Sequence, residues 1–444
     1  MASRRESKRR RARRAENEAV RNEAAEYVKD RQFYEELLEF TVSLAGKLQA
    51  SGAETYRVED TIDRVLNAYG VEKADAFVIP SSIMASLEHE NGPVVTKIRR
   101  IKASETNLDG IEQYSALCRR ICEETPDIPV LRRWLRETEA NVRHYGAFIY
   151  YLSAFLIGFG FGFFFGGGLL EAAAAGVCGA ATGATLRFMA KLNANAFFTS
   201  FVCSFILAFL ANALTAIGLC KNADIATIGA LMLLVPGFLF TNALRDTIYG
   251  DTMSGVNRLV QVLIIAIALV IGTSAAVSLA RGIFPNIGTG LEPVSYPIWA
   301  QCAAGVIGTL GFGLMFNGHG RGVPFALFGS VISGLVCSLL MRSGLPEPSC
   351  YLIAAAASSF YAEIMARVRK FPATSYLLCA LVPLIPGAGI YYTMDHLRRG
   401  LTAEAYSRGM ATAAIAGAVA IGVLLISTAF RMWGVWRRGR KNRR

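Results

Sequence analysis

The pattern of apolar and polar residues changes at about residue 145. Beyond Tyr145, long apolar stretches alternate with short polar segments, and each stretch has close to the roughly 20 residues that a helix needs to cross a bilayer. Gly158, Gly160 and Gly162 are typical of a helix surface packed in a membrane rather than of a nucleotide loop. We predict ten membrane spans at residues 147–165, 169–186, 197–217, 225–248, 259–280, 298–316, 325–341, 350–368, 374–397 and 411–430.

Before residue 145, the spacing of apolar residues is typical of a soluble α+β domain. An apolar stripe at helical spacing begins at Phe33 and continues through Leu48. A second helix is predicted from Ser51 to Gly70, with Ser51 and Glu54 forming a capping box. Strand-like alternation, and then helical periodicity, predict the remaining elements: strands at 76–79, 83–88 and 94–101, a hairpin turn at 90–93, a helix at 109–124 and an arginine-rich helix after Pro129.

The charges separate the same two parts. The chain has 46 basic and 34 acidic residues, a net charge of +12, but residues 1–145 contain 25 of each. The excess therefore lies in the apolar part, where loop and tail cations orient membrane helices. A neutral soluble domain argues against a nucleic-acid partner.

These patterns predict five regions along the chain. We expect a basic disordered tail at 1–26 with weak affinity for the anionic inner leaflet, and a cytoplasmic α+β domain at 27–145. Two five-helix membrane repeats at 146–290 and 291–432 and a basic cytoplasmic tail at 433–444 complete the chain. The first fourteen residues have no following apolar segment and do not resemble a secretory signal.

The nine cysteines are scattered, and Cys118 and Cys122 are the one close pair. We expect reduced thiols that behave as small apolar residues, no metal site and no cofactor.

An internal repeat aligns the two halves of the membrane part at an offset of 150 residues. Residues 225–272 and 375–422 share thirteen identities, which include the pairs Pro236/Pro386 and Gly237/Gly387. Because five is an odd number, the second copy starts on the opposite side of the membrane, so the halves are predicted to be inverted repeats with both termini cytoplasmic.

The fourth span of each half is interrupted by proline and glycine, at Pro236-Gly237 and at Pro386-Gly387. Proline removes a backbone donor and glycine permits a change of direction. Paired breaks of this kind point to a substrate site near the midplane, although a packing kink in each helix is the simpler alternative.

Polar residues follow both breaks. Charged groups there can neutralise a polar substrate or change protonation, unless they merely lie in headgroup water. We predict substrate binding by Pro236, Gly237, Asn242, Arg245, Pro386, Gly387, Tyr391 and Tyr392. We predict a proton relay from Asp246, Glu363, Asp395 and His396, with a structural Glu363–Arg367 pair as the alternative role for Glu363.

The run SGAETYRVED at residues 51–60 resembles the N-terminal domain of the threonine/serine exporter family, in which a G-A-E-T-x-R-V-E-like run is characteristic. The resemblance extends from about residue 30 to residue 430. Its motif residues Glu54, Arg57 and Glu59 can also be explained locally, since Glu54 can cap a helix and Arg57 can pair with Glu59 or Asp60.

The resemblance implies export of a small polar metabolite, threonine or serine, driven by the proton motive force across the plasma membrane. Related two-component systems imply dicarboxylate (succinate) export as an alternative. Two other classes stay open: a membrane-anchored hydrolase that uses the N-terminal domain, and a channel or lipid-interacting scaffold. The expected partners are the small metabolite, protons and the bilayer, and homo-oligomer formation is left open.

Overall fold

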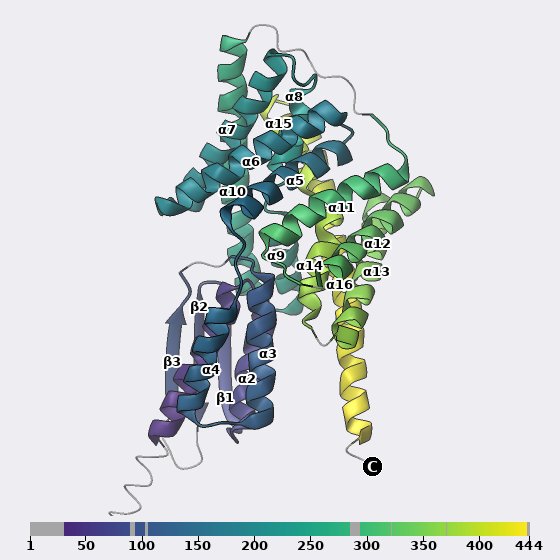
Figure 1. Ribbon diagram of the computed structural model, residues 1–444. Helices are drawn as coiled ribbons and strands as arrows, with labels where there is room; N and C mark the ends of the chain where they lie inside the picture. Colours follow the sequence, from purple (N-terminus) through teal and green to yellow (C-terminus); the bar gives the residue numbers. More distant parts are fainter. Residues whose placement is uncertain are drawn as a thin grey trace, which may run out of the picture. The chain divides into compact units, whose positions relative to one another are not determined.

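The computed structural model describes residues 31–88, 94–102, 105–284, 294–320, 322–369 and 371–441 (Figure 1). The chain divides into two compact units between Val142 and Arg143. The hairpin turn predicted at residues 90–93 and the N-terminal tail lie outside the described residues.

The first unit combines helices with a three-stranded antiparallel sheet of order β1-β2-β3. In the register, Ala76 faces Ala85 and Ala85 faces Lys97. Inward residues such as Ile83 and Leu87 on β2 are buried against the helices. The elements are a helix at residues 31–50, α2 (Thr55–Ala68), β1 (Lys73–Ile79), β2 (Ser82–Glu88), β3 (Val95–Arg100), α3 (Leu108–Glu124) and α4 (Ile128–Asn141).

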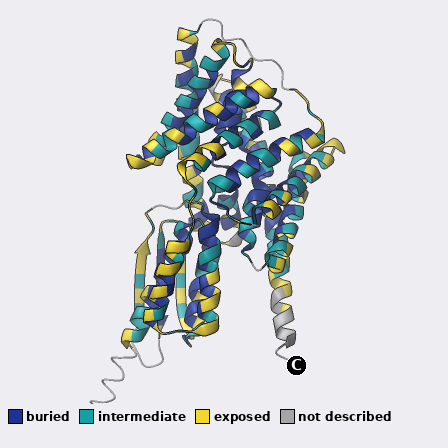
Figure 2. Cartoon of the chain, in the orientation of Figure 1, coloured by how far each residue is buried: buried dark blue, intermediate teal, exposed yellow. Residues whose placement is uncertain are grey.

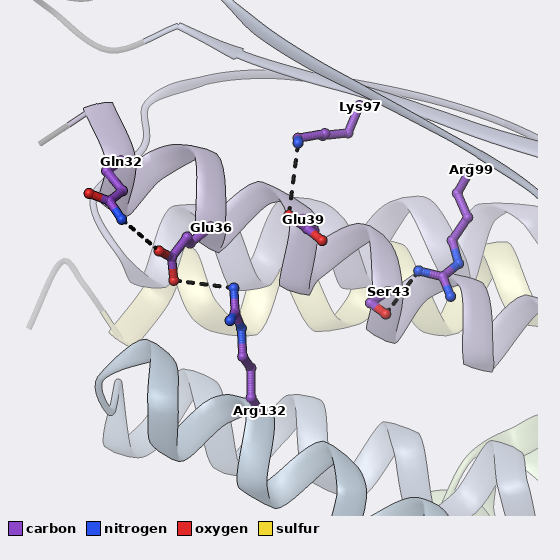
Figure 3. Close-up of polar contacts among 7 residues, drawn as sticks. All are labelled: Gln32, Glu36, Glu39, Ser43, Lys97, Arg99 and Arg132. Carbon is purple, nitrogen blue, oxygen red and sulfur yellow. Dashed lines mark hydrogen bonds and ion pairs between the residues drawn. The ribbon is translucent and has the colours of Figure 1, made fainter. Parts of the chain in front are cut away.

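Polar contacts join the helix at residues 31–50 to its neighbours (Figure 3). Ser43 Oγ accepts a hydrogen bond of 2.9 Å from Arg99 on β3. Glu36 accepts one of 3.2 Å from Arg132 on α4. Because these side chains are largely exposed, each pair adds little stability, and the buried leucines of the helix hold it in place.

The predicted capping box at Ser51 is wrong. Ser51 lies in the turn that ends the preceding helix, where its hydroxyl donates to Lys47 O at 2.9 Å, and Gly52 has a left-handed φ of 84°. The next helix begins only at Thr55, and Glu54 occupies its N-cap position without a side-chain cap bond. Glycine in the left-handed conformation terminates a helix, so Ser51 cannot start one.

The second unit is a membrane α-helical assembly. Eight helices among the described residues are long and apolar enough to cross a membrane, and a bent pair is a ninth candidate. The eight are α5 (Ala147–Phe164), α6 (Leu169–Lys191), α7 (Ala196–Ala216), α10 (Thr252–Ile283), α11 (Ile298–Met315), α12 (Gly322–Arg342), α13 (Glu347–Arg369) and α16 (Thr402–Lys441).

The remaining helices are shorter and come in two broken pairs. The first pair is α8 (Ala223–Leu231) and α9 (Gly237–Tyr249). The second is α14 (Ala373–Leu381) with the 3₁₀ turn η1 (Val382–Leu384), followed by α15 (Gly387–Arg398) after a 42° bend. The spans predicted at 225–248 and 374–397 are therefore each divided near the middle.

Small residues set the helix contacts. A Cβ added to Gly160 on α5 would lie 2.3 Å from Gly308 N on α11, so the two backbones touch there. Outward faces remain apolar, as in Leu263, Ile267 and Ile271 on α10, which are exposed on the surface of the unit. Buried positions concentrate where helices face one another (Figure 2).

The segment that enters this unit is fixed to the loop between α11 and α12. The Tyr145 hydroxyl donates to Gly318 O at 2.8 Å, and its ring stacks on His319 with centroids 4.0 Å apart. The Asn317 amide also donates to Arg143 O. The first residues of the unit are thus held by the second half of the membrane part.

The α5–α11 contact can be tested by overpacking. We expect Gly160→Val to lower the stability of the detergent-solubilised protein by about 1–3 kcal/mol, because the new side chain must separate two backbones. Gly417→Val on α16 is the matched control, since nothing lies within 4 Å of a Cβ there. Equal melting temperatures for the two variants would contradict the contact.

Cys122 on α3 offers a pH-dependent test of the first unit. The hydrogen bond with Cys118, aided by the Arg64 charge and opposed by burial, lowers the pKa of the Cys122 thiol to about 7. Because the thiolate is the nucleophile, alkylation of Cys122 by iodoacetamide should reach half its maximal rate near pH 7. The Cys122→Ser variant gives the background alkylation of the other cysteines. A half-maximal rate near pH 9 would contradict the hydrogen bond between Cys118 and Cys122.

Candidate functional site

The two helix breaks have the same backbone conformation. Pro236 has φ −78° and ψ 45°, and Pro386 has φ −76° and ψ 47°. Gly237 N donates to Val235 O at 2.8 Å, and Gly387 N donates to Ile385 O at 2.7 Å. Each break is therefore a tight three-residue turn centred on proline, close to an inverse γ-turn.

The two breaks also contact each other. A Cβ added to Gly237 would lie 1.8 Å from Cγ2 of Ile385, and one added to Gly387 would lie 2.7 Å from Sδ of Met232. Glycine is thus needed at position 237, where a methyl group would overlap the β-branched Ile385, whereas the contact at Gly387 is with the flexible end of Met232. Two segments 150 residues apart in the sequence meet at one point of the membrane unit.

Two half-helices begin at this point. Neither α9 nor α15 has a side-chain cap at its N-terminus. The first backbone N–H groups of a helix lack partners within it, and they carry the positive end of its dipole. The paired breaks consequently present two positive backbone termini at their meeting point.

A cavity of about 60 Å³ lies beside the second break, and we call it the second-break cavity. Its apolar wall includes Phe161 of α5 and Ile415 of α16, and its floor includes Pro386 and Gly389. Its charged or hydroxyl-bearing side chains are Glu347, Tyr351, Arg408 and Thr412. Of these, Thr412 already donates its hydroxyl to Arg408 O at 2.7 Å.

A smaller cavity of about 20 Å³ lies between α8, α10 and α15. It is lined by Asp224 and Asp395, and by Val235 of the first break. Asp224 lies in the first turn of α8 and Asp395 near the end of α15, and both line this cavity, so the two half-helices run antiparallel.

Residues after the first break lie away from both cavities. Arg245 and Asp246 on α9 are buried, with 8% and 7% of their surface exposed. Asp246 forms an ion pair of 2.9 Å with Arg258 on α10. Asn242 is half-buried on the same helix, and it does not line either cavity described above.

Residues after the second break lie closer to the cavities. Tyr391 and Asp395 line the smaller one, and Asp395 also pairs with Arg399 at 2.6 Å. Tyr392 stacks under Arg408, with the guanidinium carbon 5.7 Å from its ring centroid. Within the described part of the chain, His396 Nδ1 is buried without a hydrogen-bond partner.

Glu363 stands apart from the breaks. It forms an ion pair of 2.5 Å with Arg367, one turn later on α13, and lines neither cavity. The geometry supplies the structural pair that was one of its two predicted roles. A proton-carrying role would require this pair to open.

The residues of the GAETYRVED run have local partners in the first unit. Arg57 Nε donates to Glu54 at 3.1 Å, and Asp60 forms an ion pair of 2.8 Å with Arg64. Burial alone would lower the pKa of Arg57, but the Glu54 carboxylate more than offsets it, and the net shift is upward. Glu59 accepts a hydrogen bond of 3.3 Å from Val78 N on β1.

The sequence analysis did not include Glu347, Tyr351 or Arg408 among the predicted site residues. The internal repeat contains the signal that could have found them. At the offset of 150 residues, Glu347 corresponds to Phe197 and Tyr351 corresponds to Phe201. These two positions are therefore polar only in the second half. Among the described residues, no group of three or more potential metal ligands occurs.

Comparisons with known proteins identify relatives over most of the chain. A family model described as "Putative threonine/serine exporter" matches residues 39–280, and one described as "Threonine/Serine exporter, ThrE" matches residues 301–429. A threonine/serine exporter of Corynebacterium glutamicum is 22% identical over 85% of this chain and 79% of its own length. A "Probable threonine/serine exporter" of Mycobacterium tuberculosis is 20% identical over 80% and 69%, respectively. No solved structure matches the chain.

The contact between the breaks can be tested by a double substitution. Gly237→Ala should lower the melting temperature of the purified protein, because the new methyl group overlaps Cγ2 of Ile385. Ile385→Ala removes that atom, so Gly237→Ala/Ile385→Ala should lose less stability than the sum of the single changes. If the stability loss of the double variant equals the sum of the losses of the two single variants, the two breaks do not touch.

Proposed function

Because the chain belongs to the threonine/serine exporter family, we propose that it is a secondary transporter that exports threonine and serine, driven by the proton motive force. The observation that supports this most is the meeting of two proline–glycine breaks at one point of the membrane unit. Interrupted helices of this kind form substrate sites in many secondary transporters.

We further propose that the membrane unit contains ten spans as two inverted five-helix repeats. Helix contacts recur at the repeat offset: α6 packs on α8 as α12 packs on α14, and α7 packs on α10 as α13 packs on α16. Across the halves, α9 packs on α16 while α15 packs on α10. This reciprocal exchange is what a two-fold relation between the halves would produce.

In this scheme the two halves rock against each other around the breaks. The turns at Pro236 and Pro386 give each half-helix pair a fixed bend, and the close contact of Gly237 and Ile385 is the pivot. Substrate is exposed to one side of the membrane at a time. The backbone groups freed by the breaks would be satisfied by substrate, water or the opposite half.

Proton coupling would use buried carboxylates. Asp246 is held by Arg258 of α10, and Asp395 by Arg399 at the end of its own helix. Protonation of either acid would release a cation, and protonation of Asp246 would also loosen the contact between α9 and α10. His396 and Glu363 complete the proposed relay. Buried ionisable groups in membrane helices are costly and therefore commonly functional.

We place the protein in the plasma membrane with both termini cytoplasmic. The arginine-rich C-terminal end of the sequence supports this orientation under the positive-inside rule. The N-terminal unit would then be a regulatory domain: Glu54 and Arg57 pair with each other, and Glu59 holds strand β1. These structural roles favour regulation over hydrolysis.

Export can be tested in cells loaded with a threonine-containing dipeptide. Cells with the full-length chain should export threonine faster than cells without it, and an uncoupler should abolish the difference. Uncoupler-insensitive export would contradict proton coupling. Accumulation of succinate, rather than threonine, in cells without the protein would support the dicarboxylate alternative.

The proton relay can be tested in proteoliposomes. Asp246→Asn and Glu363→Gln should each reduce transport about tenfold or flatten its pH dependence, because each removes a proton-binding carboxylate. Asp60→Asn in the N-terminal unit is the control, since that pair with Arg64 is half-exposed. Full transport with unchanged pH dependence in both membrane variants would show that these two residues carry no protons.

A further inference from the structure

The second-break cavity contains two opposite charges that are not joined. Among the described residues, neither Glu347 nor Arg408 forms an ion pair with any residue, although both line the cavity. Tyr351 lies in the same cavity and interacts electrostatically with both. The three groups therefore surround a common space of about 60 Å³.

The first half of the membrane unit lacks this arrangement. Arg258 is the repeat equivalent of Arg408, and it is paired with Asp246 at 2.9 Å. The equivalent of Asp246 in the second half is His396, so Arg408 loses its carboxylate partner. Phenylalanines replace Glu347 and Tyr351 in the first half, which makes the charged cavity a property of the second half alone.

Half-buried charges without partners lose part of their hydration and gain little in return. A ligand with a negative and a positive end would satisfy both. An arginine guanidinium binds a carboxylate through two parallel hydrogen bonds, and a carboxylate binds an ammonium group. Arg408 lines the cavity, and its guanidinium carbon lies 5.7 Å from the centroid of the Tyr392 ring, an aromatic contact that leaves its charge unneutralised.

We propose, building on the export function above, that the second-break cavity binds the zwitterionic backbone of a small amino acid. Its carboxylate lies between Arg408 and the N-terminal turn of α15, represented in the cavity by Ala388 and Gly389. Its ammonium group pairs with Glu347. The small side chain packs toward the apolar wall of Phe161 and Ile415.

This assignment separates amino acids from dicarboxylates. A dicarboxylate that placed one end on Arg408 would bring its second negative charge toward Glu347, where like charges repel. An amino acid meets an opposite charge at both ends. The same cavity therefore selects the zwitterion by attraction and rejects the dianion by repulsion.

The full-length protein in proteoliposomes tests the proposal first without any substitution. Unlabelled competitors are added to labelled threonine: serine, 3-hydroxybutyrate, threonine amide and succinate. Serine should compete at concentrations similar to threonine. 3-Hydroxybutyrate lacks the ammonium group and threonine amide lacks the carboxylate, so each should compete at least tenfold more weakly. Equal competition by either analogue would overturn the proposal.

Two variants then locate the contacts. Arg408→Gln should raise the KM for threonine at least tenfold and weaken competition by 3-hydroxybutyrate as well. Glu347→Gln should raise the KM for threonine but leave 3-hydroxybutyrate unchanged and improve succinate. Glu404→Gln, an exposed acid in the first turn of α16, should keep wild-type values.

The outcomes separate this inference from the exporter function itself. Transport of threonine with wild-type KM and selectivity in both variants would leave the function standing and overturn the site. Failure of the unmodified protein to transport threonine or serine would overturn the function. If Glu347→Gln does not fold, Glu347→Asp keeps the charge and should retain the preference for threonine over 3-hydroxybutyrate.

Discussion

The contact between the two proline–glycine breaks is the constraint on which the membrane unit depends. Pro236 and Pro386 bend their chains in the same way, and the lack of a side chain at Gly237 and Gly387 lets the side chains of Ile385 and Met232 pack directly against the two bends. This contact fixes where α9 and α15 begin, and hence where two positive helix ends lie. It also joins the halves of the unit near their centre.

The halves are similar in backbone but differ in charge, and that difference is informative. Asp246 neutralises Arg258 in the first half, whereas Arg408 in the second half borders a cavity that also contains Glu347. A repeat provides the same framework twice, so a polar group that occurs in one copy alone is not needed to build the framework. The second-break cavity is consequently the better candidate for binding, and the Asp246–Arg258 pair for holding helices or moving protons.

Much of the framework could be predicted from the sequence, because the lengths of the apolar stretches and the positions of proline and glycine can be recognised locally along the chain. The breaks at Pro236 and Pro386 are found where they were predicted, and the strands of the first unit begin and end within a few residues of their predicted limits. Ser51 was misplaced because Gly52, in a left-handed conformation, ends one helix before the next begins. The sequence could not show that Glu347 and Arg408 line the same cavity, because this depends on how α13 and α16 pack. Arg245 was expected beside the substrate but lies buried outside both cavities.

In the scheme proposed above, a small amino acid binds where the breaks meet. The most direct measurement is a cryo-electron microscopy structure of the full-length protein in lipid nanodiscs with saturating threonine. We expect the two breaks to remain in contact and ligand density to lie in the second-break cavity, with its carboxylate end toward Arg408. Threonine density elsewhere among the membrane helices, with that cavity empty, would contradict it.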